Sequence, residues 1–287
     1  LHMPIRLGLL SADGSALPLV LRGEDPATRK ETTRVLELTE AEQTFVFAGV
    51  EEEPTPSLLR GFSAPVRFEM DRTPESFALQ MAHDDDAFNR WDAGQQLALG
   101  LLVKAAEQIH GGGTPTLDPA FAAAWGRVLA DESLDGSLRS QALVLPAERV
   151  VAQEMSVIHP DAIHAAREGM LVALAKEHRS ALWSLYRTLA PSGPYAHESS
   201  QIDRRRLRNT ALRMLAVDGQ EDAIEAAWEQ YGSADNMTDA QAAFMILADQ
   251  DHPRRDEVIQ GFYDKWKADP LVLDKWFTIQ ASSSRSD

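Results

Sequence analysis

The sequence predicts an α+β protein with more than one domain: a small antiparallel β-sandwich over residues 1–73, then an all-α solenoid over residues 74–287. Two observations carry this prediction. Through the first region apolar side chains recur with a period of two, which is typical of half-buried strands. From residue 74 onward the pattern becomes helix, short breaker, helix, and no strand pattern interrupts it.

Short apolar stretches at regular spacing predict the strands of the sandwich. Strands are expected near residues 5–9, 17–21, 35–38, 44–47 and 66–70. The Asp13-Gly14 turn separates the first two, and Asp25-Pro26 and Pro54-Thr55-Pro56 indicate loops. Several short strands divided by such turn signals favour a small antiparallel sandwich.

The helical region is expected to begin its first long helix at Asp84, Asp85 and Asp86, where negative charge suits the helix dipole. Gly111-Gly112-Gly113 is expected to end that helix. One face is expected to hold Phe88, Trp91, Ala98, Leu102, Ala105 and Ile109. Further helices are expected near residues 118–131, 136–144, 146–155, 160–177, 179–190, 199–217, 220–231, 238–249, 254–268 and 270–280.

The residues at the expected helix starts support this pattern. A proline at or near a helix start costs little stability, because the first helical N–H has no hydrogen-bond partner in any case. These prolines are Pro119, Pro146, Pro160 and Pro270, and the acidic residues placed to cap or charge first turns are Asp118, Asp161 and Asp269. Short helices in series favour a solenoid of antiparallel pairs. No fixed-period repeat is visible, so a closed bundle is the alternative.

Composition excludes several classes of function. The chain has no cysteine, which excludes disulfides and thiolate metal sites and favours a reducing, cytoplasmic setting. The net charge of −16 repels phosphate, so nucleic acid is not an expected partner. No uninterrupted apolar stretch is long enough for a transmembrane helix, so no membrane partner is expected. The local basic cluster Arg204, Arg205, Arg206, Arg208 and Arg213 is expected to form helix-face ion pairs with snorkelling stems.

No motif for catalysis emerges from the sequence. A zinc helix of the H-E-x-x-H type needs two histidines four residues apart, and His197-Glu198 lacks the second one and lies in an expected loop. His164 and Glu168 are spaced as an ordinary surface pair on a helix, and His159 falls on a different face. There is no G-x-S-x-G elbow. Gly111-Gly112-Gly113 lacks the strand and lysine of a phosphate loop. Catalytic, cofactor-binding and metal-ligating residues are therefore all predicted as none.

The tryptophans are expected to be core anchors, since aromatic residues at helical spacing are most often buried. All six fall in expected helices: Trp91, Trp125, Trp183, Trp228, Trp266 and Trp276. Two of them belong to Asp-Lys-Trp triplets, at Asp264-Lys265-Trp266 and Asp274-Lys275-Trp276.

Long motifs spread over nearly the whole chain resemble one family. They are residues 38–47 and 56–66 in the strand region, 83–95 at the first long helix, Arg206-Leu207-Arg208-Asn209, Asn236-Met237-Thr238-Asp239-Ala240, the two Asp-Lys-Trp triplets, and Lys275-Trp276-Phe277 with Gln280-Ala281. Together these motifs resemble the bacterial aminopeptidase N family of zinc-dependent alanyl aminopeptidases. The resemblance covers the immunoglobulin-like domain and part of the C-terminal helical domain of that family.

The resemblance implies an Ig-like sandwich followed by a superhelical solenoid of the ARM/HEAT-like kind. In the family these domains follow a thermolysin-like zinc domain, whose G-A-M-E-N loop and H-E-x-x-H helix do not occur here. The sequence is therefore expected to be a non-catalytic segment. Zinc is expected in the parent enzyme and no cofactor in this segment. Its implied partners are the catalytic domain of the same polypeptide and, through the parent, peptide substrates.

The resemblance also implies that this sequence lacks the first part of the Ig-like domain and the last part of the helical domain of the family. Leu1-His2-Met3-Pro4 looks like a break inside a longer protein, and the sandwich is expected to lack its first strand. The solenoid is expected to stop short at Ser286-Asp287. The expected role is to pack on the catalytic domain and help to wall the active-site chamber. The alternative is an independent α-solenoid that binds peptides or proteins along its concave face.

Overall fold

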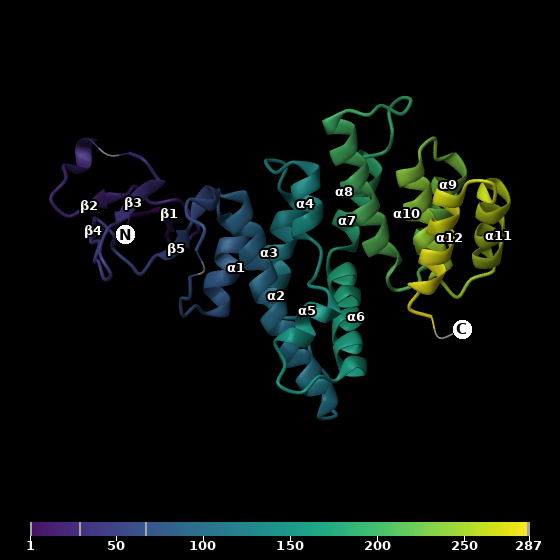
Figure 1. Cartoon of the computed structure of the whole chain (residues 1–287), viewed down its shortest axis with the longest axis horizontal. Coiled ribbons are helices and arrows are strands. Elements are labelled where there is room, and N and C mark those ends of the chain that lie inside the picture. Colours follow the sequence, from purple (N-terminus) through teal and green to yellow (C-terminus); the bar gives the residue numbers. More distant parts are fainter. Residues whose placement is uncertain (1, 29, 67, 286–287) are drawn as a thin grey trace. The chain divides into compact units, whose positions relative to one another are not determined.

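The computed structural model describes residues 2–28, 30–66 and 68–285. It divides into two compact units, Leu1–Leu134 with Gln141–Arg167, and Asp135–Ser140 with Glu168–Asp287 (Figure 1). The boundary expected near residue 73 is a different division, which lies inside the first unit. The expected end of the solenoid at residues 286–287 lies outside the described residues.

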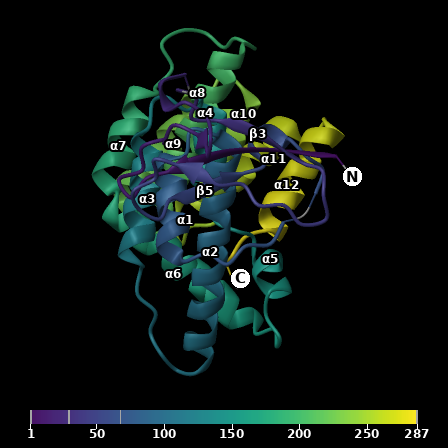
Figure 2. The ribbon, with the colours of Figure 1, turned by 90° about the vertical axis from the view of Figure 1, so that its left-hand side faces the viewer.

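Two small β-sheets form the N-terminal part of the first unit. In the larger one, β1 (Met3–Leu10) lies between β3 (Arg34–Leu38) and β5 (Thr55–Leu58), and both pairings are antiparallel. Figure 2 shows the chain from the side of these sheets, with β3 and β5 labelled. The smaller sheet pairs β2 (Val20–Leu21) with β4 (Phe47–Ala48). The buried core between them consists of Leu7, Leu9, Leu19 and Leu36. The predicted antiparallel fold is confirmed, and its inward residues follow the period of two.

Three details of the strand prediction are wrong. Two residues of the loop expected at 54–56, Thr55 and Pro56, instead belong to β5. Among the described residues β5 pairs with β1 alone, and it can accept Pro56 because an edge strand does not need every N–H. In place of the strands expected at 17–21 and 44–47, the structure has β2 and β4, which contain two residues each. Val66 and residues 68–70 form no strand, and Phe68 is 44% exposed rather than packed on the core. Arg67 lies outside the described residues.

The helical part of the first unit begins with a helix that the sequence analysis missed, α1 (Pro74–His83). Thr73 caps it by accepting the backbone N–H of Ser76, and Pro74 occupies the first turn. The long helix α2 (Ala87–His110) follows, ended by Gly111 and by Gly112 at φ 81°. α3 (Pro119–Ala130) and α5 (Glu148–Gln153) also belong to this unit, and Asp118 caps α3 as predicted.

The second unit is built from consecutive helices with short connections. They are α7 (Arg179–Thr188), α8 (Ser199–Ala216), α9 (Glu221–Ser233), α10 (Met237–Ala248), α11 (Arg254–Trp266) and α12 (Pro270–Ala281). α4 (Gly136–Ala142) and α6 (Pro160–Glu177) contribute residues to both units. Neighbours along the chain pack together, as in α7 with α8 and α9 with α10. Among the described residues, no helix is both long and apolar enough to cross a membrane.

The expected burial of the tryptophans holds only for Trp125. That ring is 1% exposed, and its Nε1–H donates to the carbonyl of Leu143 at 3.1 Å. The other five are half-buried in the described structure. A helix of a solenoid contacts its neighbours on part of its circumference, so a large indole at the margin of that contact stays partly in solvent.

Candidate functional site

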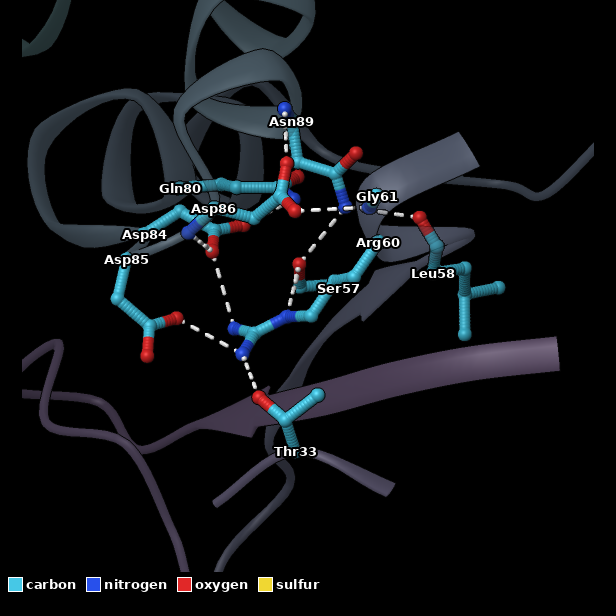
Figure 3. A network of polar contacts seen from close by, with 10 residues as sticks. All are labelled: Thr33, Ser57, Leu58, Arg60, Gly61, Gln80, Asp84, Asp85, Asp86 and Asn89. Atoms are coloured by element: carbon cyan, nitrogen blue, oxygen red, sulfur yellow. Dashed lines mark hydrogen bonds and ion pairs between the residues drawn. The ribbon is translucent and has the colours of Figure 1, made fainter. Parts of the chain in front are cut away.

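The most elaborate polar cluster in the first unit surrounds a buried arginine, Arg60, at the junction between the sandwich and the helices (Figure 3). Its side chain is 3% exposed. Nη2 lies 3.0 Å from Oδ1 of Asp84, whose side chain is fully buried, and Nη1 lies 2.8 Å from Oδ1 of Asp85. Nε donates to Ser57 Oγ at 2.9 Å, and Nη1 donates to Thr33 Oγ1 at 2.6 Å. One guanidinium therefore joins the strand region to the connection between α1 and α2.

Two amide side chains and a further carboxylate surround the Arg60–Asp84 pair. Gln80 donates to Oδ2 of Asp84 at 2.7 Å. Asn89 donates to Ser57 Oγ and to the carbonyl of Leu58, both at 2.8 Å. Asp86 caps α2 and also accepts the backbone N–H of Gly61 at 2.9 Å. Because these side chains bond to one another, the arrangement is suited to holding two structural layers in one geometry rather than to moving protons.

The backbone around Arg60 adopts an uncommon conformation. Leu59, Gly61 and Phe62 have φ values of 57°, 61° and 55°, in the left-handed region. Such a conformation is strained for bulky residues by roughly 1–3 kcal/mol each, and it persists where the surrounding structure fixes it. The bonds of Arg60 and Gly61 across the junction supply that fixation.

Gly8 provides the space that Arg60 occupies. A Cβ atom at Gly8 would lie 2.2 Å from Cζ of Arg60. We expect Gly8→Ala to lower the free energy of unfolding by about 1–3 kcal/mol, because the guanidinium is held on several sides and cannot move freely. Gly100→Ala is the control: apart from its chain neighbours and the local backbone of α2, nothing lies within 4 Å of its Cβ position, so a gain of about 0.5–1 kcal/mol is expected from helix propensity. Urea unfolding measures both, and an unchanged or raised stability for Gly8→Ala would contradict the packing described.

His83 forms a second contact at the same junction. Gly14, at φ 84°, packs so closely that a Cβ there would lie 2.2 Å from Cγ of the imidazole. Burial lowers the pKa of His83 below its ordinary value of 6.5, and the nearby Arg127 and Arg90 lower it further, while Asp13 opposes the shift. The neutral imidazole is therefore the form that this junction accommodates.

This pKa shift predicts a loss of stability in mild acid. Below pH 6.5 the unfolded chain protonates His83 before the folded chain does, so stability is fully present above 6.5 and falls as the pH drops toward the folded pKa. Asp13 and Asp131, with pKa values lowered to about 2, titrate in a separate and more acidic window. In urea unfolding between about pH 7.5 and pH 5, His83→Gln should flatten the fall in stability. His197→Gln, at an exposed loop residue, should leave it as in the parent chain. An equally steep fall in His83→Gln would contradict the assignment.

The second unit has a buried polar cluster of its own, in which two of the sequence motifs meet. Asn209 of α8 donates to Oδ1 of Asp239 at 2.9 Å, and Asn236, the N-cap of α10, donates to Oδ2 at the same distance. Gln230 of α9 donates to Asn209 Oδ1 at 2.7 Å and accepts from Arg208 at 2.6 Å. The motif residues thus fix the mutual positions of α8, α9 and α10.

Three arginines of the basic cluster on α8, Arg204, Arg205 and Arg208, make contacts other than the expected ion pairs. Arg204 donates to the carbonyl oxygens of Leu189 and Ala190, which end α7. Arg205 and Arg208 lie over the rings of Tyr195 and Tyr186, at 4.7 and 4.2 Å from the ring centroids. Guanidinium groups are well suited to both contacts, because they are planar and carry several donors. These arginines therefore hold the end of α7 and its following loop.

The histidines singled out in the sequence lie apart from these clusters. His164 Nδ1 lies 2.8 Å from Oε1 of Glu148, a residue of α5. His197 is exposed in the loop before α8. His159 stacks on His110 with ring centroids 3.5 Å apart. Within residues 2–28, 30–66 and 68–285, no group of three or more His, Cys, Asp or Glu side chains could hold a metal ion. That no residue of this chain is a catalytic, cofactor or metal ligand stays a prediction.

Comparisons with known proteins give the same architecture. The family of Ig-like domains of unknown function named DUF3458 matches residues 1–71, and the family of ARM-repeat domains named DUF3458_C matches residues 74–287. The sandwich and the helical region that follows it are therefore an Ig-like domain and an ARM-repeat domain.

Three similar proteins extend the comparison. Aminopeptidase N of Escherichia coli is 37% identical over 284 residues, which are 99% of this chain and 32% of that protein. Aminopeptidase N of Caulobacter vibrioides is 31% identical over 281 residues, 98% of this chain and 31% of that protein. The crystal structure of Legionella pneumophila aminopeptidase A in complex with aspartic acid matches with a TM-score of 0.77 and 25% identity, over 99% of this chain and 32% of that one. The chain spans about a third of the length of these relatives.

Proposed function

Because the chain belongs to the family of ARM-repeat domains named DUF3458_C, preceded by its Ig-like companion DUF3458, we propose that it is a non-catalytic segment of a zinc-dependent aminopeptidase. The parent enzyme would remove N-terminal residues from peptides. The observation that carries this proposal is the match over 98–99% of the chain to proteins named Aminopeptidase N, of which it covers 31–32%.

The chemistry of the parent would belong to the remainder of the polypeptide. The residues that the structure describes do not fit a zinc centre, since no three potential ligands converge among them. A zinc site needs three or four ligands at about 2.0–2.3 Å from one point. In our proposal, zinc and the peptide-binding residues that act on the scissile bond lie in a catalytic domain of the same chain.

In our proposal, this segment helps to enclose the active-site chamber of the parent enzyme. The Arg60 junction holds the sandwich against the first helices, and the Asp239 cluster holds three consecutive helices together. Rigid walls of this kind would exclude bulk water and large substrates from a chamber next to the catalytic domain. The absence of cysteine is compatible with a cytoplasmic enzyme of peptide catabolism.

The test of this proposal is the sequence that precedes residue 1 in the parent gene. We expect an H-E-x-x-H motif with a more distant glutamate, because two histidines four apart on a helix and a third ligand assemble a catalytic zinc site. If the reading frame upstream carries no such motif, the aminopeptidase proposal is wrong. The helical repeats would then be interpreted as an independent binding module.

A further inference from the structure

Three aromatic rings, two of them exposed and one half-buried, form a patch beside the Arg60 junction. Phe62 is 68% exposed and Phe88 is 38% exposed, although both are large apolar side chains. The ring centroids of Phe62 and Phe88 are 4.2 Å apart, and those of Phe88 and Trp91 are 5.4 Å apart. We refer to Phe62, Phe88 and Trp91 as the aromatic platform. Exposed apolar side chains that contact one another commonly mark an interaction site, whereas isolated ones do not.

The aromatic platform is held in place on both sides. Phe62 follows directly on the turn that Arg60 anchors, and the N–H of Gly61 donates to Asp86 at the start of α2. Phe88 and Trp91 lie in the first turns of that same helix. The backbone that carries the three rings is therefore held in place before any partner binds, which reduces the entropy that binding would cost.

The bonds of Arg60 and Gly61 across the junction fix the backbone next to Phe62, but the ring of Phe62 does not serve the core of this chain. A φ of 55° is rare for a bulky residue, and here the ring that it positions is mostly in solvent. Strain of this kind is typical of functional surfaces, where the position of a side chain matters more than local stability.

We propose that the aromatic platform is the surface on which the catalytic portion of the parent polypeptide docks. This inference rests on the proposed function. The relatives are about three times as long as this chain, so a large covalently linked partner is available in proteins of this kind. A second copy of this chain is disfavoured, because two bodies of net charge −16 repel each other.

Charges of both signs lie near the turn that carries Phe62. Asp85 pairs with Arg60 at 2.8 Å, and a Cβ atom at Gly61 would lie 3.2 Å from Nη1 of Arg6. The docked surface is therefore expected to place an apolar side chain over the rings.

Oxidative footprinting of the full-length parent polypeptide and of the 287-residue chain tests the proposal. Phe62 and Phe88 should be oxidised several times more slowly in the full-length protein than in the isolated chain. Equal rates in both would overturn the assignment even if the parent proves to be an active aminopeptidase. Protection that appears only at high concentration of the isolated chain would show a second copy as the occupant, which also overturns it.

A pair of variants separates docking from folding. Phe62→Asn removes the ring, and asparagine accepts a positive φ, so the isolated chain should keep its melting temperature. The same variant should lower the melting temperature of the full-length protein. Val157→Asn, at another exposed apolar residue (61%) of the first unit, is the matched control and should leave both unchanged. If Phe62→Asn leaves the full-length protein unaffected, the platform is not a docking surface. If the upstream sequence encodes no peptidase yet the rings are protected, both the proposed function and a catalytic occupant of the platform are wrong, and the docked portion is of another kind.

Discussion

Arg60→Ala is expected to lower the free energy of unfolding by about 3–5 kcal/mol, because it leaves the buried carboxylate of Asp84 without its cation. The side chains of this pair are 3% and 0% exposed, so water cannot solvate the carboxylate in place of the guanidinium. The same variant removes the donors that reach Ser57 and Thr33. Chemical denaturation followed by tryptophan fluorescence and circular dichroism measures the loss.

A double-mutant cycle distinguishes the ion pair from simple loss of packing. Arg60→Met with Asp84→Leu removes both charges and should be clearly more stable than either single variant. Lys267→Ala is the control for a pair at the surface: both side chains of the Lys267–Asp264 pair are 54% exposed, so water and salt screen the contact and little change in stability is expected. A loss for Arg60→Ala no larger than that of the control would show that the junction does not depend on this contact.

Phe244→Ala is expected to cost about 3–5 kcal/mol in the second unit, because it opens a cavity in a fully buried position. The Phe244 ring, in α10, stacks on Phe262 of α11 with centroids 4.6 Å apart and planes 22° apart. This contact joins successive helices of the repeat, so its loss should also weaken their mutual packing. Hydrogen exchange of the amides in both helices is expected to speed up together.

The next residue along the same helix supplies the control. Met245 is 46% exposed, so Met245→Ala should change stability by no more than about 0.5 kcal/mol. Comparable losses for both variants would contradict the assignment of the inward and outward faces of α10. Exchange that rises in α10 alone would show that the ring contact does not couple the two helices.

The helices could be predicted from the sequence because their ends carry explicit local signals. Asp118, Asn236 and Asp269 each accept backbone N–H groups at a helix start, as their residue types indicate. The helix α1 was missed because Thr73-Pro74 looks like a simple break. In the structure the same two residues cap and begin a helix that buries Met81.

The strands were less predictable, because pairing partners lie far apart in the sequence. Pro56 suggested a loop, yet it pairs opposite Leu9 in an edge strand. Val66 and Phe68 alternate like strand residues, but no neighbouring strand accepts them among the described residues. Alternation alone does not show whether a partner is present.

The junction itself was beyond prediction from sequence. Asp84 was interpreted as a charge for the helix dipole, whereas it is the buried partner of Arg60, 24 residues earlier. Nothing in the local pattern marks an arginine as buried, and only Gly8 and Gly61 hint at the close packing around it. Polar clusters depend on contacts between distant segments, which a single sequence does not display.

The Asp-Lys-Trp triplets have an architectural role. Trp276 donates to the carbonyl of Ile259 at 2.9 Å and lies 5.3 Å from the ring of Tyr263, so it fixes α12 against α11. Trp266 lies 6.5 Å from Phe262. Both indoles are half-buried, and they act at the margin of helix contacts rather than at their centre.

The central claim, that this chain is a non-catalytic segment of a zinc aminopeptidase, is tested most directly by metal content and peptidase activity measured side by side. The full-length parent polypeptide should carry zinc and cleave an aminoacyl anilide. The purified 287-residue chain, made in a host that lacks its own aminopeptidase, should bind no stoichiometric zinc and cleave none. A metal-dependent rate in the isolated chain, or a full-length protein with neither zinc nor activity, would contradict the account.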